Sequence, residues 1–123
     1  MKNIKYQYND GGRRAAGYSP YAGDCVVRAI AIVTGACYLE VYEFVNRMCK
    51  GKPLSFYGVD KKICSKILRH LGAKWVAGCK LPTKGKYVLN MHGHLAALVD
   101  GTVQDTYESL AAHKLYGYWK MPS

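Results

Sequence analysis

The sequence has few acidic residues, no Cys-x-x-Cys pair and no long apolar run, and each shortage excludes a class of protein. Its five cysteines are an odd number with spacings that fit neither a disulfide framework nor a zinc site. No apolar stretch approaches the ~18 residues of a membrane span, and residues 1–6 lack the apolar segment of a signal peptide. We therefore expect a soluble, cytoplasmic protein with no membrane partner, no metal and no other cofactor.

Basic residues outnumber acidic ones. Eighteen Lys and Arg against eight Asp and Glu give a net charge of +10. Such a charge favours anionic partners such as nucleic acid, acidic protein surfaces or anionic lipid. The basic residues are scattered along the chain and form no basic tail, so an ordinary solvated cationic surface is the other interpretation.

The length and composition predict one globular domain over residues 1–123, since half of the residues are apolar. The first 23 residues are rich in Gly, Tyr, Asn and Asp and predict a loop-like lead-in with room for a short strand. Apolar spacing predicts helices over 24–34, 39–49 and 60–71. Short strands are expected at 73–77, 86–92, 94–99, 102–106 and 115–121. This order predicts an α+β fold with N-terminal helices packed on a C-terminal antiparallel sheet.

Cys25 opens the most apolar predicted helix, directly after Asp24. The unpaired N–H groups and the dipole at a helix N-terminus favour a thiolate, the form of cysteine that acts as a nucleophile. We expect Asp24 to cap the helix and to point at the N–H groups of residues 26 or 27. The other interpretation of Cys25 is a small buried thiol, which is what we expect of the other four cysteines.

The Asp100-Gly101 pair predicts a two-residue hairpin loop. With that loop, Ala96 pairs with Asp105, and strand alternation puts His94 on the same face as Asp105. The two side chains are then diagonal neighbours across the hairpin. A histidine held by a carboxylate is the base that a cysteine nucleophile needs, because the carboxylate fixes the tautomer of the ring and supports the imidazolium. A strand histidine and a hairpin-end aspartate without a joint role are the alternative.

Two stretches, GDCVVRA at 23–29 and GHLAALVDG at 93–101 with Asp105 shortly after, resemble small papain-like cysteine hydrolases. These include hydrolases common in phage and bacterial genomes and, more distantly, the NlpC-type cell-wall peptidases. The resemblance spans about residues 10–107. It implies a papain-like domain in which Cys25 is the nucleophile, His94 the general base and acid, and Asp105 the group that orients the histidine.

Acyl transfer also needs donors for the oxyanion, and the backbone N–H of Cys25 can supply one. The glutamine that papain relatives carry upstream of the cysteine is missing here. The candidates for a second donor are side chains of the lead-in, namely Tyr18, Ser19, Tyr21 and Asn9. Tyr21 is favoured because NlpC-type sites use an upstream tyrosine.

The sequence thus predicts a cysteine hydrolase that cleaves or transfers an amide, isopeptide or thioester bond in a protein or peptide-like substrate. If the protein is encoded by a phage, it would act in the host cytoplasm. One alternative is a catalytically inactive papain-like protein that binds a host factor, and another is a basic nucleic-acid-binding module. His92 and His94 have the spacing of two metal ligands but no evident third, and His70 and His113 are expected at the surface.

Overall fold

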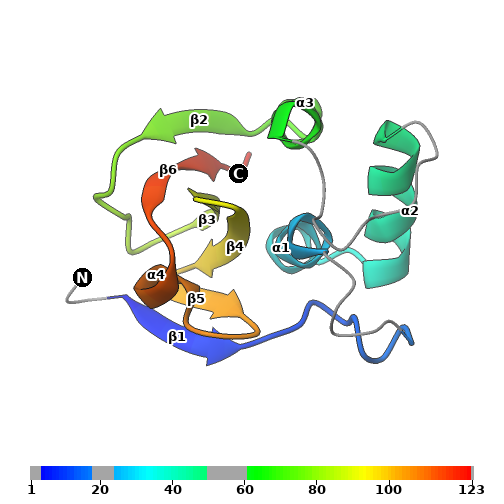
Figure 1. Ribbon diagram of the computed structural model, residues 1–123, viewed down its shortest axis with the longest axis horizontal. Coiled ribbons are helices and arrows are strands. Elements are labelled where there is room, and N and C mark those ends of the chain that lie inside the picture. Colours follow the sequence, from blue (N-terminus) through cyan, green and yellow to red (C-terminus); the bar gives the residue numbers. More distant parts are fainter. Residues whose placement is uncertain (1–3, 18–23, 50–60, 123) are drawn as a thin grey trace.

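A computed structural model describes residues 4–17, 24–49 and 61–122 of the chain (Figure 1). In these ranges the helices are α1 (Cys25–Thr34), α2 (Tyr38–Met48), α3 (Lys61–His70) and the short α4 (Ser109–Ala112). The strands are β1 (Lys5–Tyr8), β2 (Lys74–Ala77), β3 (Lys86–Met91), β4 (His94–Val99), β5 (Thr102–Asp105) and β6 (Leu115–Lys120). The α+β prediction is confirmed, and α4 is the described element that the sequence pattern did not predict.

The described strands form one mixed sheet in the order β1-β5-β4-β3-β6-β2. The prediction of a purely antiparallel, C-terminal sheet is wrong, because β1 comes from the lead-in and runs parallel to β5. The backbone N–H of Asn9 continues this pairing with a 2.9 Å bond to the carbonyl of Asp105. Partners so far apart in the chain meet only through the tertiary fold, which no local pattern reveals.

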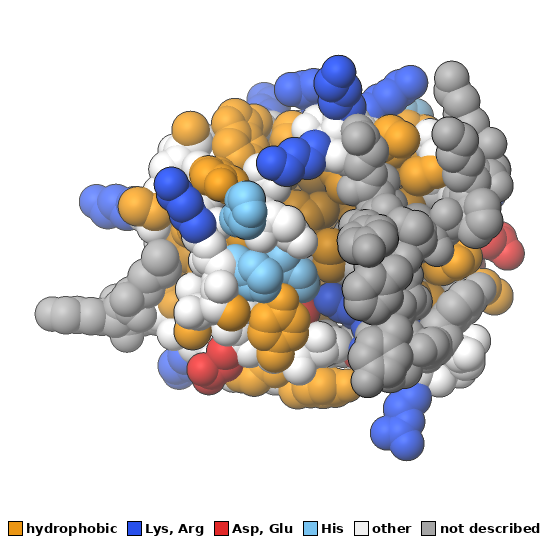
Figure 2. Space-filling model, viewed as in Figure 1, with side chains coloured by type: hydrophobic (Ala, Val, Ile, Leu, Met, Phe, Trp, Pro, Cys, Tyr) orange, Lys and Arg blue, Asp and Glu red, His pale blue; other side chains and the backbone are white. Residues whose placement is uncertain are grey.

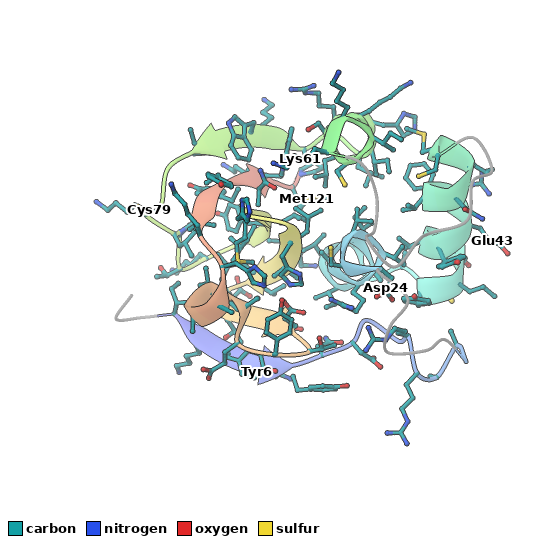
Figure 3. The ribbon with its side chains drawn as sticks, viewed as in Figure 1. Tyr6, Asp24, Glu43, Lys61, Cys79 and Met121 are labelled. Carbon is teal, nitrogen blue, oxygen red and sulfur yellow. The ribbon has the colours of Figure 1, made fainter. Side chains whose placement is uncertain are left out.

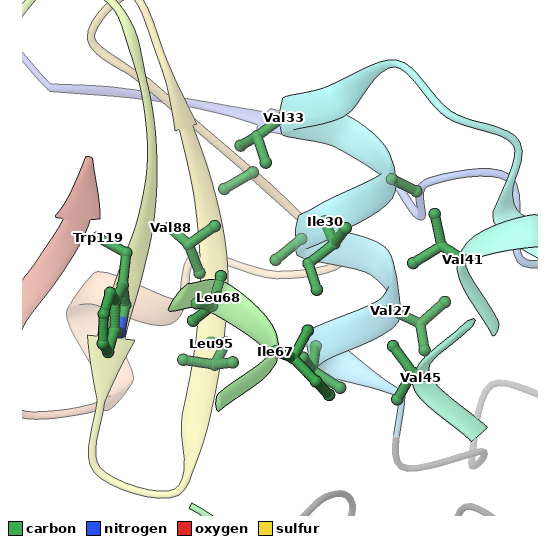
Figure 4. Close-up of a cluster of buried hydrophobic side chains, with 14 of the residues drawn as sticks. Val27, Ile30, Val33, Val41, Val45, Ile67, Leu68, Val88, Leu95 and Trp119 are labelled. Carbon is green, nitrogen blue, oxygen red and sulfur yellow. The ribbon is translucent and has the colours of Figure 1, made fainter. Parts of the chain in front are cut away.

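Helix α1 lies between the sheet and α2 (Figure 1), and seven of its ten residues are buried. In Figure 4, Val41 and Val45 of α2 flank one side of α1, while Val88, Leu95 and Trp119 of the sheet lie toward the other. The helix is therefore nearly enclosed by protein. Among the described residues, no helix has the length and apolarity to span a bilayer.

The central strands of the sheet are buried on both faces. On β4, Leu95 and Ala97 belong to the cluster around α1, whereas Ala96 and Leu98 belong to a second cluster on the opposite face. Strict alternation of this kind is expected when side chains of successive strand residues point to opposite faces. It fixes the register of β4, because a slip of one residue would exchange the two clusters.

The cysteines are less buried than expected. Cys37 and Cys79 are exposed, and Cys25, Cys49 and Cys64 are half-buried. The expectation that four of them fill the core is wrong for Cys37, which precedes α2 as its N-cap residue, and for Cys79, which follows β2. The spacing of apolar residues assigns a residue to a helix or strand. It does not predict how exposed a residue is when it lies in the loop at the end of that element.

Gly117 lets β2 approach β6 closely. A Cβ atom at this position would lie 2.5 Å from the carbonyl oxygen of Val76 and 2.6 Å from the Trp75 ring. We expect Gly117→Ala to lower the free energy of unfolding by about 1–3 kcal/mol, because the added methyl group forces the two strands apart. Urea unfolding followed by circular dichroism measures the change, and a midpoint equal to that of the wild type would contradict the close packing.

Candidate active site

Cys25, His94 and Asp105 meet at one end of α1. Cys25 is the first residue of α1, His94 the first of β4 and Asp105 the last of β5. Since β4 and β5 are antiparallel, His94 and Asp105 lie at the same end of the hairpin. The N-terminus of α1 reaches this end, and Cys25 lies close enough to the His94 ring to raise its pKa. The structure therefore brings together the three residues that the sequence singled out.

The hairpin between β4 and β5 has the predicted register. Val99 pairs with Thr102 and Leu98 with Val103. The two loop residues between them, at positions 100 and 101, have φ values of 48° and 80°, as the tight hairpin turn requires. This register places Asp105 on the same face as the strand-opening histidine, and the predicted diagonal contact is confirmed.

His94 is held between a carboxylate and a thiol. Its Nε2 atom lies 2.6 Å from Oδ2 of Asp105, which leaves Nδ1 for Cys25. Burial alone would lower the pKa of His94, but the hydrogen bonds to Asp105 and Cys25 and the charges of these groups raise it to about 9. A pKa of about 9 favours the imidazolium at neutral pH, in which both ring nitrogens carry a proton.

Asp105 is buried and fully bonded. Its Oδ2 atom accepts a 2.6 Å bond from the Ser109 hydroxyl and its Oδ1 atom a 2.7 Å bond from the backbone N–H of Thr106. Burial by itself would raise the pKa of the Asp105 carboxyl, but the bonds from His94, Ser109 and Thr106 hold it below its usual value. Ser109 opens α4, so the helix that the sequence pattern missed supplies a donor that keeps Asp105 ionised.

Asp24 is fully buried and faces two arginines. Its Oδ1 atom accepts bonds from Arg28 at 2.7 Å and Arg13 at 3.2 Å, and its Oδ2 atom accepts one from the Tyr38 hydroxyl. Asp24 makes no capping bond to α1, so the prediction that it points at the N–H groups of residues 26 or 27 is wrong. Charge-assisted bonds to guanidinium groups are stronger than bonds to neutral amides. The carboxylate is thereby neutralised beside Cys25 instead of repelling a thiolate there.

Arg28 connects Asp24 to the hairpin formed by β4 and β5. Its Nη1 atom bonds to Asp24, and its Nη2 atom lies 3.5 Å from Oδ1 of Asp105. The guanidinium is nearly buried, with 10% of the side chain exposed. Arg28 therefore ties α1 to β5 at the level of the site. The sequence carried a signal for it, because Arg28 is the one charged residue inside the apolar helix and stands four positions after Asp24.

A second histidine packs on the first. The rings of His94 and His113 stack with centroids 5.0 Å apart and planes 13° apart. Nε2 of His113 lies 2.6 Å from the Tyr107 hydroxyl and its Nδ1 lies 3.1 Å from the carbonyl oxygen of His92. His113 is partly exposed, in line with the expected surface position, and the turn through α4 also folds it back over the site. His70 is exposed, as expected.

The structure describes one of the four candidates for the second oxyanion donor. Three of them, Tyr18, Ser19 and Tyr21, lie outside the described residues. The Asn9 amide donates a 2.8 Å bond to Gln104 and accepts one of 2.8 Å from the backbone N–H of Gly11. Asn9 also lines a pocket of about 360 Å³ with Ala31 and Gly35. Its side-chain amide is therefore bonded to Gln104 and does not point at Cys25 in this structure.

Arg28 is expected to matter for stability through the buried carboxylates it neutralises. Arg28→Gln leaves Asp24 and Asp105 short of a charge partner, and losing one partner of a buried ion pair typically costs about 3–5 kcal/mol. Arg14→Gln is the matched control, since Arg14 is exposed and its loss changes the free energy of unfolding by about 0.5 kcal/mol or less. Urea unfolding of both variants tests this, and equal losses would contradict a structural role for Arg28.

His94 is expected to make the stability depend on pH. Its pKa rises from 6.5 in the unfolded chain to about 9 in the fold. The stabilisation is therefore complete below pH 6.5 and is lost as the pH rises through about 9. His94→Gln should cost about 2 kcal/mol more at pH 6 than at pH 10. Urea unfolding of wild type and variant at both values measures the difference, and a cost independent of pH would show that the ring is not held as an imidazolium.

Within residues 4–17, 24–49 and 61–122, no three or more His, Cys, Asp and Glu side chains gather in a way that could hold a metal ion. His92 and His94 have separate partners, since Nδ1 of His92 lies 3.0 Å from the Tyr116 hydroxyl. Comparison of the chain with family models, with curated proteins and with solved structures finds no match. A functional assignment therefore rests on the geometry of the site itself.

Proposed function

We propose that this protein is a papain-like cysteine hydrolase that cleaves or transfers an amide, isopeptide or thioester bond in a protein or peptide-like substrate. The observation that carries the proposal is the position of His94 between the Cys25 thiol and the Asp105 carboxylate. A helix that begins at the nucleophile and packs on the sheet bearing the other two groups supports the papain-like assignment.

The cations around the site outnumber its buried carboxylates. Three cations, the guanidinium groups of Arg13 and Arg28 and the His94 imidazolium, face the two buried carboxylates of Asp24 and Asp105. A buried charge is costly unless it is paired. A thiolate beside the imidazolium supplies the third negative charge and leaves the cluster neutral.

In the first half-reaction, Sγ of Cys25 attacks the carbonyl carbon, and the C=O electron pair moves to the oxygen. The backbone N–H of Cys25 can donate to that oxyanion, because Asp24 leaves the helix N-terminus uncapped by its side chain. The tetrahedral intermediate collapses as the bond to the leaving group breaks. His94 gives its proton to the leaving amine or thiol, and the acyl group remains on Cys25 as a thioester.

In the second half-reaction, the neutral His94 takes a proton from water, or from an acceptor nucleophile in a transfer reaction. The resulting nucleophile attacks the thioester, and the C–S bond breaks to restore the thiolate and the imidazolium. Asp105 keeps the ring in place through both steps, since its oxygens are fixed by Ser109 and Thr106. The His113 ring stacks on one face of the His94 ring and restrains it there.

Thiol reactivity tests the proposal without knowledge of the substrate. We expect iodoacetamide to alkylate Cys25 about tenfold faster than Cys37 at pH 6, although Cys37 is the more exposed. Cys37 is a matched control because it also stands at the start of a helix but has no described histidine bonded to it. His94→Ala should abolish the difference. Peptide mass spectrometry after timed quenching measures both rates, and equal rates in the wild type would refute an activated thiol.

Catalysis itself is tested with an activated ester such as p-nitrophenyl acetate. Cys25→Ala should remove turnover and His94→Ala should slow it by about 10²–10⁴-fold, the usual contribution of general acid–base catalysis. Cys37→Ala should leave turnover unchanged. If Cys25 is reactive but no turnover is found with any ester or thioester, the protein is a binding protein with a hydrolase-like site.

A further inference from the structure

His113 covers one face of the His94 ring and is itself partly exposed. Figure 2 shows histidine side chains grouped on the face toward the viewer, and Figure 3 labels Asp24, which marks the end of α1 that carries the site. The segment between β5 and β6 brings His113 there. It is anchored by the buried Ser109, whose hydroxyl bonds to the site carboxylate, and by Leu110, which packs on the second apolar cluster. Because these anchors hold the backbone, the movement left to His113 is rotation of its side chain.

The hydrogen bonds of His113 do not depend on its charge. Its Nδ1 atom lies 3.1 Å from the carbonyl oxygen of His92, which only accepts, so Nδ1 carries a proton. Its Nε2 atom lies 2.6 Å from the Tyr107 hydroxyl, which can donate as well as accept. A neutral ring accepts the hydroxyl proton, and a charged ring donates to the hydroxyl oxygen. These bonds permit both charge states, so the surroundings of the ring decide between them.

The surroundings of His113 oppose a second positive charge. His94 is charged at neutral pH, since a pKa of about 9 favours the imidazolium. The carboxylate of Asp105 is already paired with His94 and Arg28. The other titratable or charged groups that the described elements bring to this cluster are Cys25 of α1, His92 of the turn between β3 and β4, and Tyr107, Glu108 and Lys114 of the segment between β5 and β6. Glu108 carries the one further carboxylate among them, and it is exposed, where water and salt screen it.

Two charged rings would repel each other in this stack. With centroids 5.0 Å apart, the rings place two unit charges at about that distance. Near a protein surface, such a repulsion disfavours the doubly charged stack by about tenfold or more. Histidine side chains take up a proton between about pH 8 and pH 5. Because Asp105 ties the His94 ring to the hairpin, the ring that leaves the stack is that of His113.

We propose that His113 is a positioning residue for His94 that acts while it is neutral, and that its protonation in mild acid turns its ring out of the stack. The inference rests on the proposed hydrolase only where it concerns turnover. In the stacked state, His113 fixes the plane of the ring that exchanges protons with Cys25 and the substrate. Without the stack, water reaches that face of His94, and the geometry of proton transfer is less well defined. Mild acid thus lowers the activity without changing the three groups that carry the reaction.

Ring contacts measured by NMR test the movement without a substrate. The full chain should show a nuclear Overhauser effect between the ring protons of His94 and His113 at pH 8, and the effect should be lost at pH 5. His113→Phe supplies an uncharged ring that stacks on an imidazolium, so its contact with His94 should persist at pH 5. His113→Tyr provides a second uncharged ring if the first variant does not fold. Circular dichroism at both pH values monitors the fold.

Two results of the NMR experiment would overturn the proposal. One is a wild-type contact that persists at pH 5, since charge would then not move the ring. The other is a contact that disappears equally in His113→Phe, since the loss would then not depend on the charge of His113.

Turnover of p-nitrophenyl acetate tests whether the stack positions His94 for the proposed reaction. The turnover of His113→Phe relative to wild type should rise by up to about tenfold from pH 8 to pH 5, the factor by which charge disfavours the stack. His70→Phe is the matched control, because His70 is another exposed histidine that packs on an aromatic ring, that of Phe44 at 5.7 Å. Its turnover relative to wild type should not change with pH. A constant ratio for His113→Phe would show that His113 has a structural role alone.

The two measurements separate this inference from the proposed function. If turnover is absent at every pH, the hydrolase proposal fails, and the NMR contact still decides whether charge moves His113. If turnover is present but the contact does not change with pH, the hydrolase proposal stands and the positioning role controlled by charge fails.

Discussion

The ion pairs of Arg28 with Asp24 and Asp105 are the contact on which the arrangement of the site depends. They join the first turn of α1 to the end of β5, and they do so where the surroundings exclude water. Because an unpaired buried charge is costly, each of these groups restricts where the other two can lie. The apolar contacts of α1 with the sheet set the distance between the two elements, whereas the ion pairs set their register. Cys25 and His94 inherit their relative positions from this register.

These ion pairs also give the two buried aspartates, Asp24 and Asp105, different surroundings. Asp24 neighbours the nucleophile in the chain, and a free carboxylate there would oppose a thiolate. Its charge is instead matched by Arg13 and Arg28. Asp105 is farther away in sequence and is bonded to the histidine, where a negative charge stabilises the imidazolium. An aspartate charge would thus oppose the proposed chemistry at Asp24 and supports it at Asp105. The two arginines compensate the charge of Asp24.

The sequence sufficed for the parts of the site that local rules govern. The helix that begins at Cys25 follows from an apolar run bounded by Asp24 and Gly35, and the meeting of His94 with Asp105 follows from a loop of two residues. It did not suffice for the direction of Asp24, because capping the helix and pairing with arginine are both local options and the choice depends on Arg13 and Tyr38. The parallel pairing of β1 and the stacking of His113 on the site depend likewise on partners far away in the chain.

The buried charges are paired, because an unpaired charge in the interior is costly. Charges at the surface are solvated by water and need no such partner. The acidic residues within the described part of the chain lie on the helices and loops near α1 and β5, where two of them meet the buried arginines. Lys74 of β2 and Lys120 of β6 are exposed, so burial does not require a partner for their charges. A one-sided surface charge raises the rate and strength of encounter with anions of any kind.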